Sequence, residues 1–312
     1  MGRVVVVGGL NMDLHLFGLR ESGGQAPLVA ERHLVQPGGK GGNVARAAVR
    51  LGAEVTLVAR VGDDDFGRHC LDAVAGDGVD ASGVIVTPEQ PTGFVAIDLQ
   101  HGKHRSLVFS PGANESLAWD DVAPHVAGLT ADDIVVAQAE VHPATLSALA
   151  TALSARGVPL FLDPAPPDRV RRDHLAAADV VTPDLDEAAL LTGRADTSRL
   201  WRATAARELR AAGARRVLLK TSESGALLLD DDGLREVPTA SVEVADETGA
   251  GDVFMAALAV ARLEGRGWEE AARFANAASA ISVSRLGLGL PGRDEVAALE
   301  RDLRAATPPG TG

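Results

Sequence analysis

Short runs of β-branched and other apolar residues alternate along the chain with longer alanine-rich segments. Apolar runs bounded by polar turns are typical of strands that are buried on both faces of a parallel sheet. The pattern predicts an α/β fold with a doubly wound, mostly parallel sheet and a largely helical C-terminal third. The expected strands are 3–8, 54–62, 133–138, 158–163, 178–183 and 215–220, and the expected helices before that last third are 41–51, 64–76, 143–155, 184–192 and 198–212.

Two stretches, 14–35 and 93–109, interrupt this alternation. Both look like strands, and QHGKHR supplies a polar turn in the second. Because ligands collect at the carboxyl ends of strands in open α/β sheets, a small sheet there would serve as a lid; an ordinary edge hairpin is the alternative. The expected division is a core of 1–13, 36–92 and 110–306, a β-sheet lid of 14–35 and 93–109, and a disordered tail of 307–312.

Composition narrows the function classes. A chain of 312 residues with 46% hydrophobic and 23% charged side chains can bury a large core. The formal charge of −13, without a basic cluster interleaved with aromatics, argues against nucleic acid and anionic membranes as partners. One cysteine, Cys70, excludes an internal disulfide framework, and no apolar run approaches the ~20 residues of a membrane span. The N-terminus does not look like a signal peptide, so a cytoplasmic protein is expected.

A glycine-rich segment, QPGGKGGNVARAAVRLG at 36–52, places four glycines around Lys40 and then begins a helix. Glycines let a ligand approach the backbone, and the N–H groups at a helix start favour oxygen-rich ligands. The segment is neither a Walker A motif nor a GxGxxG fingerprint, and a plain strand-to-helix turn is the alternative. The chain has three lysines, Lys40, Lys103 and Lys220, against 27 arginines, which hints at specific roles for Lys40 and Lys220 at strand ends.

Acidic side chains follow two of the predicted strands. Asp13, with Asn11 close by, follows the first strand, and Glu140 lies just beyond the strand 133–138. Carboxylates and amides suit vicinal hydroxyls because they accept or donate hydrogen bonds in fixed geometry. Taken singly, an acid at such a position is more often a turn or capping residue.

The segment ADETGAGDVF, residues 245–254, sets Gly249, Ala250 and Gly251 before Asp252 at the start of an apolar helix. Unpaired N–H groups at a helix start can bind a developing negative charge. Asp252 is then either a capping acid of the first turn or a general base that takes a proton from a hydroxyl attacking a phosphoryl group. The segment alone does not decide between the two.

Together these motifs resemble the ribokinase-like (PfkB) carbohydrate kinases, and within that family the ribokinases most of all. The resemblance covers nearly the whole chain and rests on NMDL, GGKGGN, GDDDFG, PGAN, DPAP, TPDLDE and DETGAGD, in that order. GGKGGN and DETGAGD are the two strongest of these. The resemblance implies a kinase that transfers the γ-phosphoryl group of ATP to a primary hydroxyl of a small sugar, with ribose as the first candidate. It also implies Mg²⁺, K⁺ and a homodimer formed through the lid.

Roles for individual residues follow from the same resemblance. Asp252 would be the catalytic base, and the backbone N–H groups of Ala250, Gly251 and Asp252, which follow Gly249, would form the anion hole. The sugar hydroxyls would be held by Asn11, Asp13, Gly39, Lys40, Gly41, Gly42, Asn43 and Glu140. The nucleotide would lie against Asp184, Lys220, Thr221, Ser222, Glu223, Ser224, Gly225, Gly251 and Asn276. Glu187 would serve Mg²⁺, and Asp246 and Thr248 would hold K⁺ with backbone carbonyls near Ser282, Arg285 and Gly287.

The chain also departs from the family pattern. Asp184 stands where the family usually has Asn, which adds negative charge near the phosphates. Ser222 replaces a glycine-containing phosphate turn, and the PxxGE segment common near the lid is missing. Lid shape, substrate choice and dimerisation are therefore less constrained by the motifs than the chemistry is.

Three other functions remain open at this point. A nucleoside kinase on the same scaffold would need an apolar surface for the base, whereas the lid carries few aromatics, Phe17, Phe94 and Phe109. A fructokinase or other hexose kinase is a second possibility. A sugar- or nucleotide-binding regulator that has lost catalysis is a third, with Asp184 as the residue that raises it and the intact GAGD against it.

Overall fold

A computed structural model of the chain describes residues 2–20, 28–194 and 201–306, and its centre is a nine-stranded sheet in the order β13-β12-β11-β10-β9-β8-β1-β4-β5. From β11 to β5 neighbouring strands run parallel, while β12 and β13 form an antiparallel hairpin at one edge. The strands are β1 (Val4–Val7), β4 (Val55–Gly62), β5 (Asp80–Thr87), β8 (Ile134–Gln138), β9 (Leu160–Asp163), β10 (Val180–Val181), β11 (Val217–Lys220), β12 (Ala226–Asp230) and β13 (Gly233–Val237).

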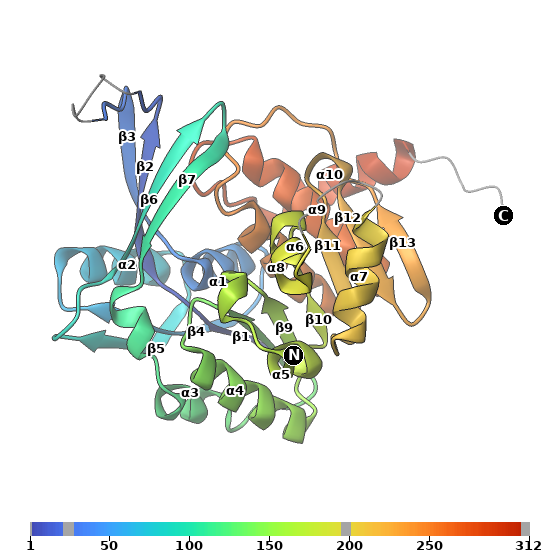
Figure 1. Ribbon diagram of the computed structural model, residues 1–312, viewed down its shortest axis with the longest axis horizontal. Helices are drawn as coiled ribbons and strands as arrows, with labels where there is room; N and C mark the ends of the chain where they lie inside the picture. Colours follow the sequence, from blue (N-terminus) through green and yellow to red (C-terminus); the bar gives the residue numbers. More distant parts are fainter. Residues whose placement is uncertain (1, 21–27, 195–200, 307–312) are drawn as a thin grey trace.

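Helices cover both faces of this sheet (Figure 1). The central strand β1 reads VVVV and is buried throughout: Val4 and Val6 pack into one core, Val5 and Val7 into the other. The first core is completed by α1 (Lys40–Arg50), α2 (Asp65–Gly76), α8 (Ala250–Leu263), α9 (Trp268–Val283) and α10 (Arg293–Ala306). The second is completed by α3 (Trp119–Val126), α4 (Pro143–Arg156), α5 (Arg172–Ala177), α6 (Leu185–Thr192) and α7 (Arg202–Ala211).

A second, four-stranded sheet in the order β3-β2-β6-β7 projects from the end of the core (Figure 1). Its strands are β2 (Asn11–Phe17), β3 (Arg32–Gly38), β6 (Gly93–Gln100) and β7 (Lys103–Ser110). The turn between β6 and β7 has positive φ at His101 and Gly102, 53° and 77°, as a tight type I′ hairpin requires. The sheet starts at Asn11, earlier than the expected residue 14, so Asn11 and Asp13 belong to a strand of the small sheet and not to a turn above the large one.

The predicted α/β architecture is confirmed, and each predicted strand and helix has a counterpart. The hydrophobic pattern missed α3, α5, β5 and the hairpin of β12 and β13, which are short or lie near an edge of the sheet. Parts of the predicted lid (21–27), of the predicted helix 198–212 (198–200) and the whole predicted tail lie outside the described residues. Within the described part of the chain, the helices are all too short or too polar to cross a membrane.

Candidate active site

The N-terminus of α8 brings Asp252 into the centre of the candidate site. Gly249 is the N-cap residue with φ 74°, a left-handed conformation that glycine adopts without strain, and it turns the chain into the helix. The Asp252 side chain is 5% exposed and caps no N–H of its own helix. Its Oδ2 instead accepts a hydrogen bond from Asn43 Nδ2 at 2.8 Å, and its Oδ1 lies 3.6 Å from Lys40 Nζ. The Asp252 carboxylate is therefore held by side chains of α1 and does not act as a helix cap.

Burial raises the pKa of Asp252, the nearby Lys40 opposes that rise, and the carboxylate of Asp163 adds to it. A carboxylate whose pKa is raised is a stronger base, when ionised, than an exposed aspartate. The Oδ1 atom has no hydrogen-bond partner. It is the atom available to a hydroxyl of a bound ligand.

Several other buried polar atoms around Asp252 also lack partners. Asn11 Nδ2, Asp13 Oδ1 and Asn43 Oδ1 are each buried without a hydrogen bond. All three residues meet at the glycine-rich turn before and within α1: a Cβ on Gly38 would lie 1.9 Å from Asp13 Oδ2, and one on Gly39 would lie 2.7 Å from the Asn11 nitrogen. Unpaired buried donors and acceptors are costly, so a cluster of them indicates a polar ligand that satisfies them.

Glu140 closes the same cluster from the end of β8. Its Oε2 accepts the Lys40 backbone N–H at 3.2 Å. Burial raises the pKa of Glu140 to about 7, with Lys40 opposing and Asp252 reinforcing the rise. Burial and the charges of Glu140 and Asp252 likewise raise the pKa of Asp13 well above its usual range. Three carboxyl groups thus share one buried space, which favours protonation of some of them in the absence of ligand.

Asp163, at the end of β9, was not predicted as a site residue although the DPAP motif contains it. It is 1% exposed and receives both site lysines: Lys40 Nζ lies 2.9 Å from Oδ2 and Lys220 Nζ lies 3.5 Å from Oδ1. Asn114, in the PGAN motif, was also missed. Its side chain donates to Asn11 Oδ1 at 2.7 Å and so fixes the Asn11 amide.

The residues predicted for the nucleotide lie around the end of β11. Thr221 to Gly225 form a tight turn in which Ser222 has φ 52°, a left-handed conformation that residues other than glycine rarely adopt. Asp184 is the N-cap of α6 and forms a reciprocal capping box with Glu187, with both hydrogen bonds at 2.7 Å. Asn276 is buried, and its amide nitrogen donates to the carbonyls of Val237 and Pro238. Asn276 therefore anchors the backbone beside the site.

The anion hole differs from the expected one at one residue. The Ala250 N–H donates to the Glu247 carbonyl at 3.2 Å and is engaged in the turn. The N–H groups of Gly251 and Asp252 lie in the first turn, where no intrahelical acceptor is available. A Cβ on Gly251 would lie 3.0 Å from Lys220 Nζ, so this position is close to a cation as well as to the helix N-terminus.

The residues predicted for a monovalent cation gather behind this turn. Asp246 is fully buried, with its two oxygens accepting the N–H groups of Thr248 at 2.9 Å and Gly287 at 3.0 Å. Two histidines of the small sheet, missed by the sequence analysis, touch the same loop. His15 Nδ1 lies 3.6 Å from Asp246 Oδ2, and His104 Nε2 lies 3.0 Å from the Thr248 hydroxyl. The Arg285 side chain points away, to Glu295 and the Leu290 carbonyl.

Comparison with known proteins gives consistent matches along the chain. The model of the pfkB family of carbohydrate kinases matches residues 1–294. Ribokinase of Bacillus subtilis is 31% identical over 303 residues, which cover 95% of this chain and 98% of that one. The crystal structure of ribokinase from Thermotoga maritima has a TM-score of 0.85 at 29% identity and covers 96% of this chain and 100% of that one. The structure of Arabidopsis thaliana ribokinase complexed with ribose and ATP has a TM-score of 0.84 at 29% identity, with coverage of 96% and 99%.

Proposed function

This chain belongs to the pfkB family of carbohydrate kinases and is a phosphotransferase that acts on hydroxyl groups, and we propose that it transfers the γ-phosphoryl group of ATP to O5 of ribose. The observation that carries the proposal is the cluster of unpaired buried atoms on Asn11, Asp13 and Asn43 around Asp252. It offers both a donor and acceptors, as a polyhydroxylated ligand needs. The relative from A. thaliana, complexed with ribose and ATP, supports this choice of sugar.

In this mechanism Asp252 accepts the proton of the attacking hydroxyl. Its Oδ1 is unpaired, and Asn43 holds the other oxygen at 2.8 Å, so the carboxylate is already oriented. The N–H groups of Gly251 and Asp252 stabilise the charge on the transferring group, together with the positive end of α8. Phosphoryl transfer needs mainly positioning and charge stabilisation, and both come from one helix start and one glycine-rich turn.

Mg²⁺ bound with ATP would neutralise phosphate charge, and the donor chemistry near β11 fits a hard cation. Glu187 uses Oε2 in its capping contact with Asp184, which leaves the second carboxylate oxygen for the cation or its waters. Asp184 likewise uses Oδ1 in that contact. We assign Glu187 as the Mg²⁺-side residue and treat Asp184 first as the helix cap that orients it.

We further propose that K⁺ binds at the loop of Asp246 and Thr248 beside the anion hole. A fully buried carboxylate at a bend where Gly287 also converges supports this assignment. Replacing KCl by NaCl at constant ionic strength should lower kcat for the sugar by several-fold. Equal rates in the two salts would remove K⁺ from the site.

The small sheet is proposed as the lid and as the dimer interface. Its outer face carries an apolar row in register across all four strands, Val35, Leu14, Ala96 and Val108, with Val35 47% and Val108 67% exposed. Exposed apolar sheet surface of this kind favours association with a second copy. The change Val108→Lys should shift the protein to monomers in sedimentation analysis while leaving the fold intact. A monomeric wild type would instead assign this face to lid closure alone.

One observation favours a nucleoside as the second candidate substrate. Phe109 is 37% exposed and lies in register with Val95 and Asp13, hence on the face that carries Asp13. A base attached to the sugar could stack on it. Coupled ADP release on ribose, 2-deoxyribose, fructose, adenosine and pseudouridine separates the candidates: we expect the highest kcat/KM for ribose. A preference for a nucleoside, for fructose, or binding without any turnover would each replace the proposal by the corresponding alternative.

A further inference from the structure

Two of the three lysines of the chain converge on one carboxylate. Lys40 comes from the start of α1 and Lys220 from the end of β11, and their ammonium groups lie 2.9 Å and 3.5 Å from the two oxygens of Asp163. The chain has 27 arginines against these three lysines, so lysine is rare in it. A compact, strongly hydrated ammonium group can rotate its donors toward a phosphate oxygen, which the planar fork of arginine cannot do equally well.

The two ammonium groups lie close to the first turn of α8. Lys220 Nζ is close to Gly251, since a Cβ there would lie 3.0 Å from it, and Lys40 Nζ lies 3.6 Å from Asp252 Oδ1. Lys220 is also 3.9 Å from Glu187 Oε2, on the nucleotide side, whereas the Lys40 backbone N–H contacts Glu140 on the sugar side. Asp163 thus holds Lys220, on the nucleotide side, and Lys40, on the sugar side, near the position where a phosphoryl group would pass.

We propose that Asp163 is a positioning residue that holds Lys40 and Lys220 beside the α8 N-terminus, so that both ammonium groups bind the phosphoryl group during its transfer. This inference rests on the proposed phosphoryl transfer to a sugar. Asp163 contacts both ammonium groups, while Asp252 lies 3.6 Å from Lys40 and Glu187 lies 3.9 Å from Lys220, so the carboxylates fix where the two cations are held. Anchoring the flexible lysine stems before the substrate arrives reduces the conformational entropy lost on binding.

The electrostatics of the trio agree with this geometry. Burial alone would raise the pKa of Asp163, but Lys220 and Lys40 outweigh it and hold the pKa below the usual value. Asp163 therefore remains ionised at neutral pH. Burial would lower the pKa of Lys220 and of Lys40, and the surrounding carboxylates, with Asp163 first among them, reverse that effect in both. Both lysines stay charged.

The change Asp163→Asn tests the proposal because it keeps the size of the side chain and removes its charge. We expect kcat to fall about 10- to 100-fold, the range found when an orienting partner is lost. The KM of ATP should stay within about twofold of wild type or decrease, because the released lysines still attract phosphate, and the Kd of ribose, which carries no phosphate, should stay within about twofold. A merely structural role would instead raise both constants and lower the melting temperature.

Asp179→Asn is the matched control. Asp179 directly precedes β10, at the amino ends of the strands, whereas Asp163 lies at the carboxyl end of β9. Asp179 also contacts two basic side chains, Arg216 at 2.8 Å and Arg215 at 3.2 Å. It is remote from the site, so its loss should affect stability and leave kcat unchanged. If Asp179→Asn and Asp163→Asn lower kcat equally, the effect is general destabilisation and the proposal fails.

A second measurement does not depend on turnover. ADP with aluminium fluoride, a mimic of the planar transferring phosphoryl group, should raise the melting temperature of the wild type more than ADP alone does. This additional shift should disappear in Asp163→Asn. It should be as small in the double variant Asp163→Asn/Lys220→Met as in Lys220→Met alone. An undiminished shift in Asp163→Asn would overturn the proposal. The wild type could show this shift and Asp163→Asn lose it while no sugar of the substrate panel is phosphorylated. That result would reject the proposed substrate and retain the role of Asp163 in positioning Lys40 and Lys220.

Discussion

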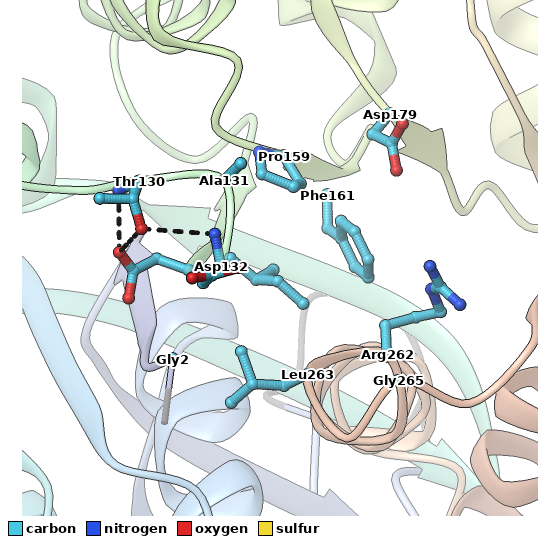
Figure 2. A pocket seen from close by; sticks show the side chains of 12 residues that line it. Gly2, Thr130, Ala131, Asp132, Pro159, Phe161, Asp179, Arg262, Leu263 and Gly265 are labelled. Carbon is cyan, nitrogen blue, oxygen red and sulfur yellow. Dashed lines mark hydrogen bonds between the residues drawn. The ribbon is translucent and has the colours of Figure 1, made fainter.

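The carboxyl edge of the nine-stranded sheet, where its parallel strands end, differs from the amino edge, where they begin, in how charged side chains are paired. At the carboxyl edge, Asp13, Asp163 and Asp252 are at most 5% exposed and share a buried space with Glu140. At the amino edge, a cavity of about 550 Å³ opens between the starts of β1, β8 and β9 and the C-terminal end of α8 (Figure 2). The same helix α8 therefore begins at the buried charges and ends at the cavity.

The difference lies in how the polar atoms are satisfied. At the cavity, Asp133 accepts hydrogen bonds from the Arg3 N–H at 3.0 Å and from the Thr130 N–H at 2.8 Å. At the carboxyl edge Asp13 and Asp252 each keep a buried oxygen without a partner. Unsatisfied buried groups cost stability, and folds retain them where a ligand or a reaction needs them. Unmet polar atoms are thus a better guide to this active site than open volume is.

The largest expected effect concerns Asp252. The change Asp252→Asn keeps an oxygen for the Asn43 hydrogen bond and removes the base, so kcat should fall by about 10²-fold or more. Ribose binding by calorimetry should remain close to wild type. At the other edge Ala131→Leu, which fills part of the cavity, should leave kcat unchanged. Near-normal turnover of Asp252→Asn, or a comparable loss in Ala131→Leu, would break the contrast between the edges.

How far the sequence predicts this site depends on whether a residue's role is local. The start of α8 at Ala250 followed from ADETGAGDVF alone, and the family membership and sheet architecture inferred from the motifs are confirmed. Asp163 was missed because its role exists only where α1, β9 and β11 meet. The engagement of the Ala250 N–H by Glu247 likewise depends on how the turn closes, which small residues leave open.

The roles that stay proposals are those that need a ligand to be seen. Asp252 could be read from its segment as a cap or a base, and the structure turns its carboxylate toward Asn43. The motifs placed Asn276 at the nucleotide, whereas its amide is occupied by two backbone carbonyls. His15 comes close to the predicted cation loop from a different sheet, and no motif relates the two. Long-range contacts of this kind are set by packing and leave no local pattern.

The next effect in size is on stability at the carboxyl edge. The folded-state pKa of Glu140 is raised from 4.5 to about 7, so the folded protein binds a proton more tightly than the unfolded chain. The folded state is then destabilised progressively as pH rises from 4.5 to about 7. The change Glu140→Gln should therefore stabilise the protein at pH 8 by up to about 3 kcal/mol and change little at pH 4.5, while it weakens sugar binding. Urea unfolding at the two pH values measures this; equal effects at both would contradict it.

The smallest effect is expected at the amino edge and has the opposite sign. Burial would raise the pKa of Asp133, but hydrogen bonds from Thr130 and Arg3 outweigh it and lower the pKa. A carboxyl with a lowered folded-state pKa stabilises the protein above its unfolded pKa, and this contribution is lost as pH falls through the folded value. The change Asp133→Asn should thus lower the melting temperature slightly at pH 7, and the deficit should shrink below pH 4. Since Asp133 is only partly buried, solvent screening keeps the effect well below that of Glu140→Gln. A stabilised Asp133→Asn at pH 7 would mean that the amino edge, too, keeps a carboxylate at a cost, and the two edges would no longer differ in kind.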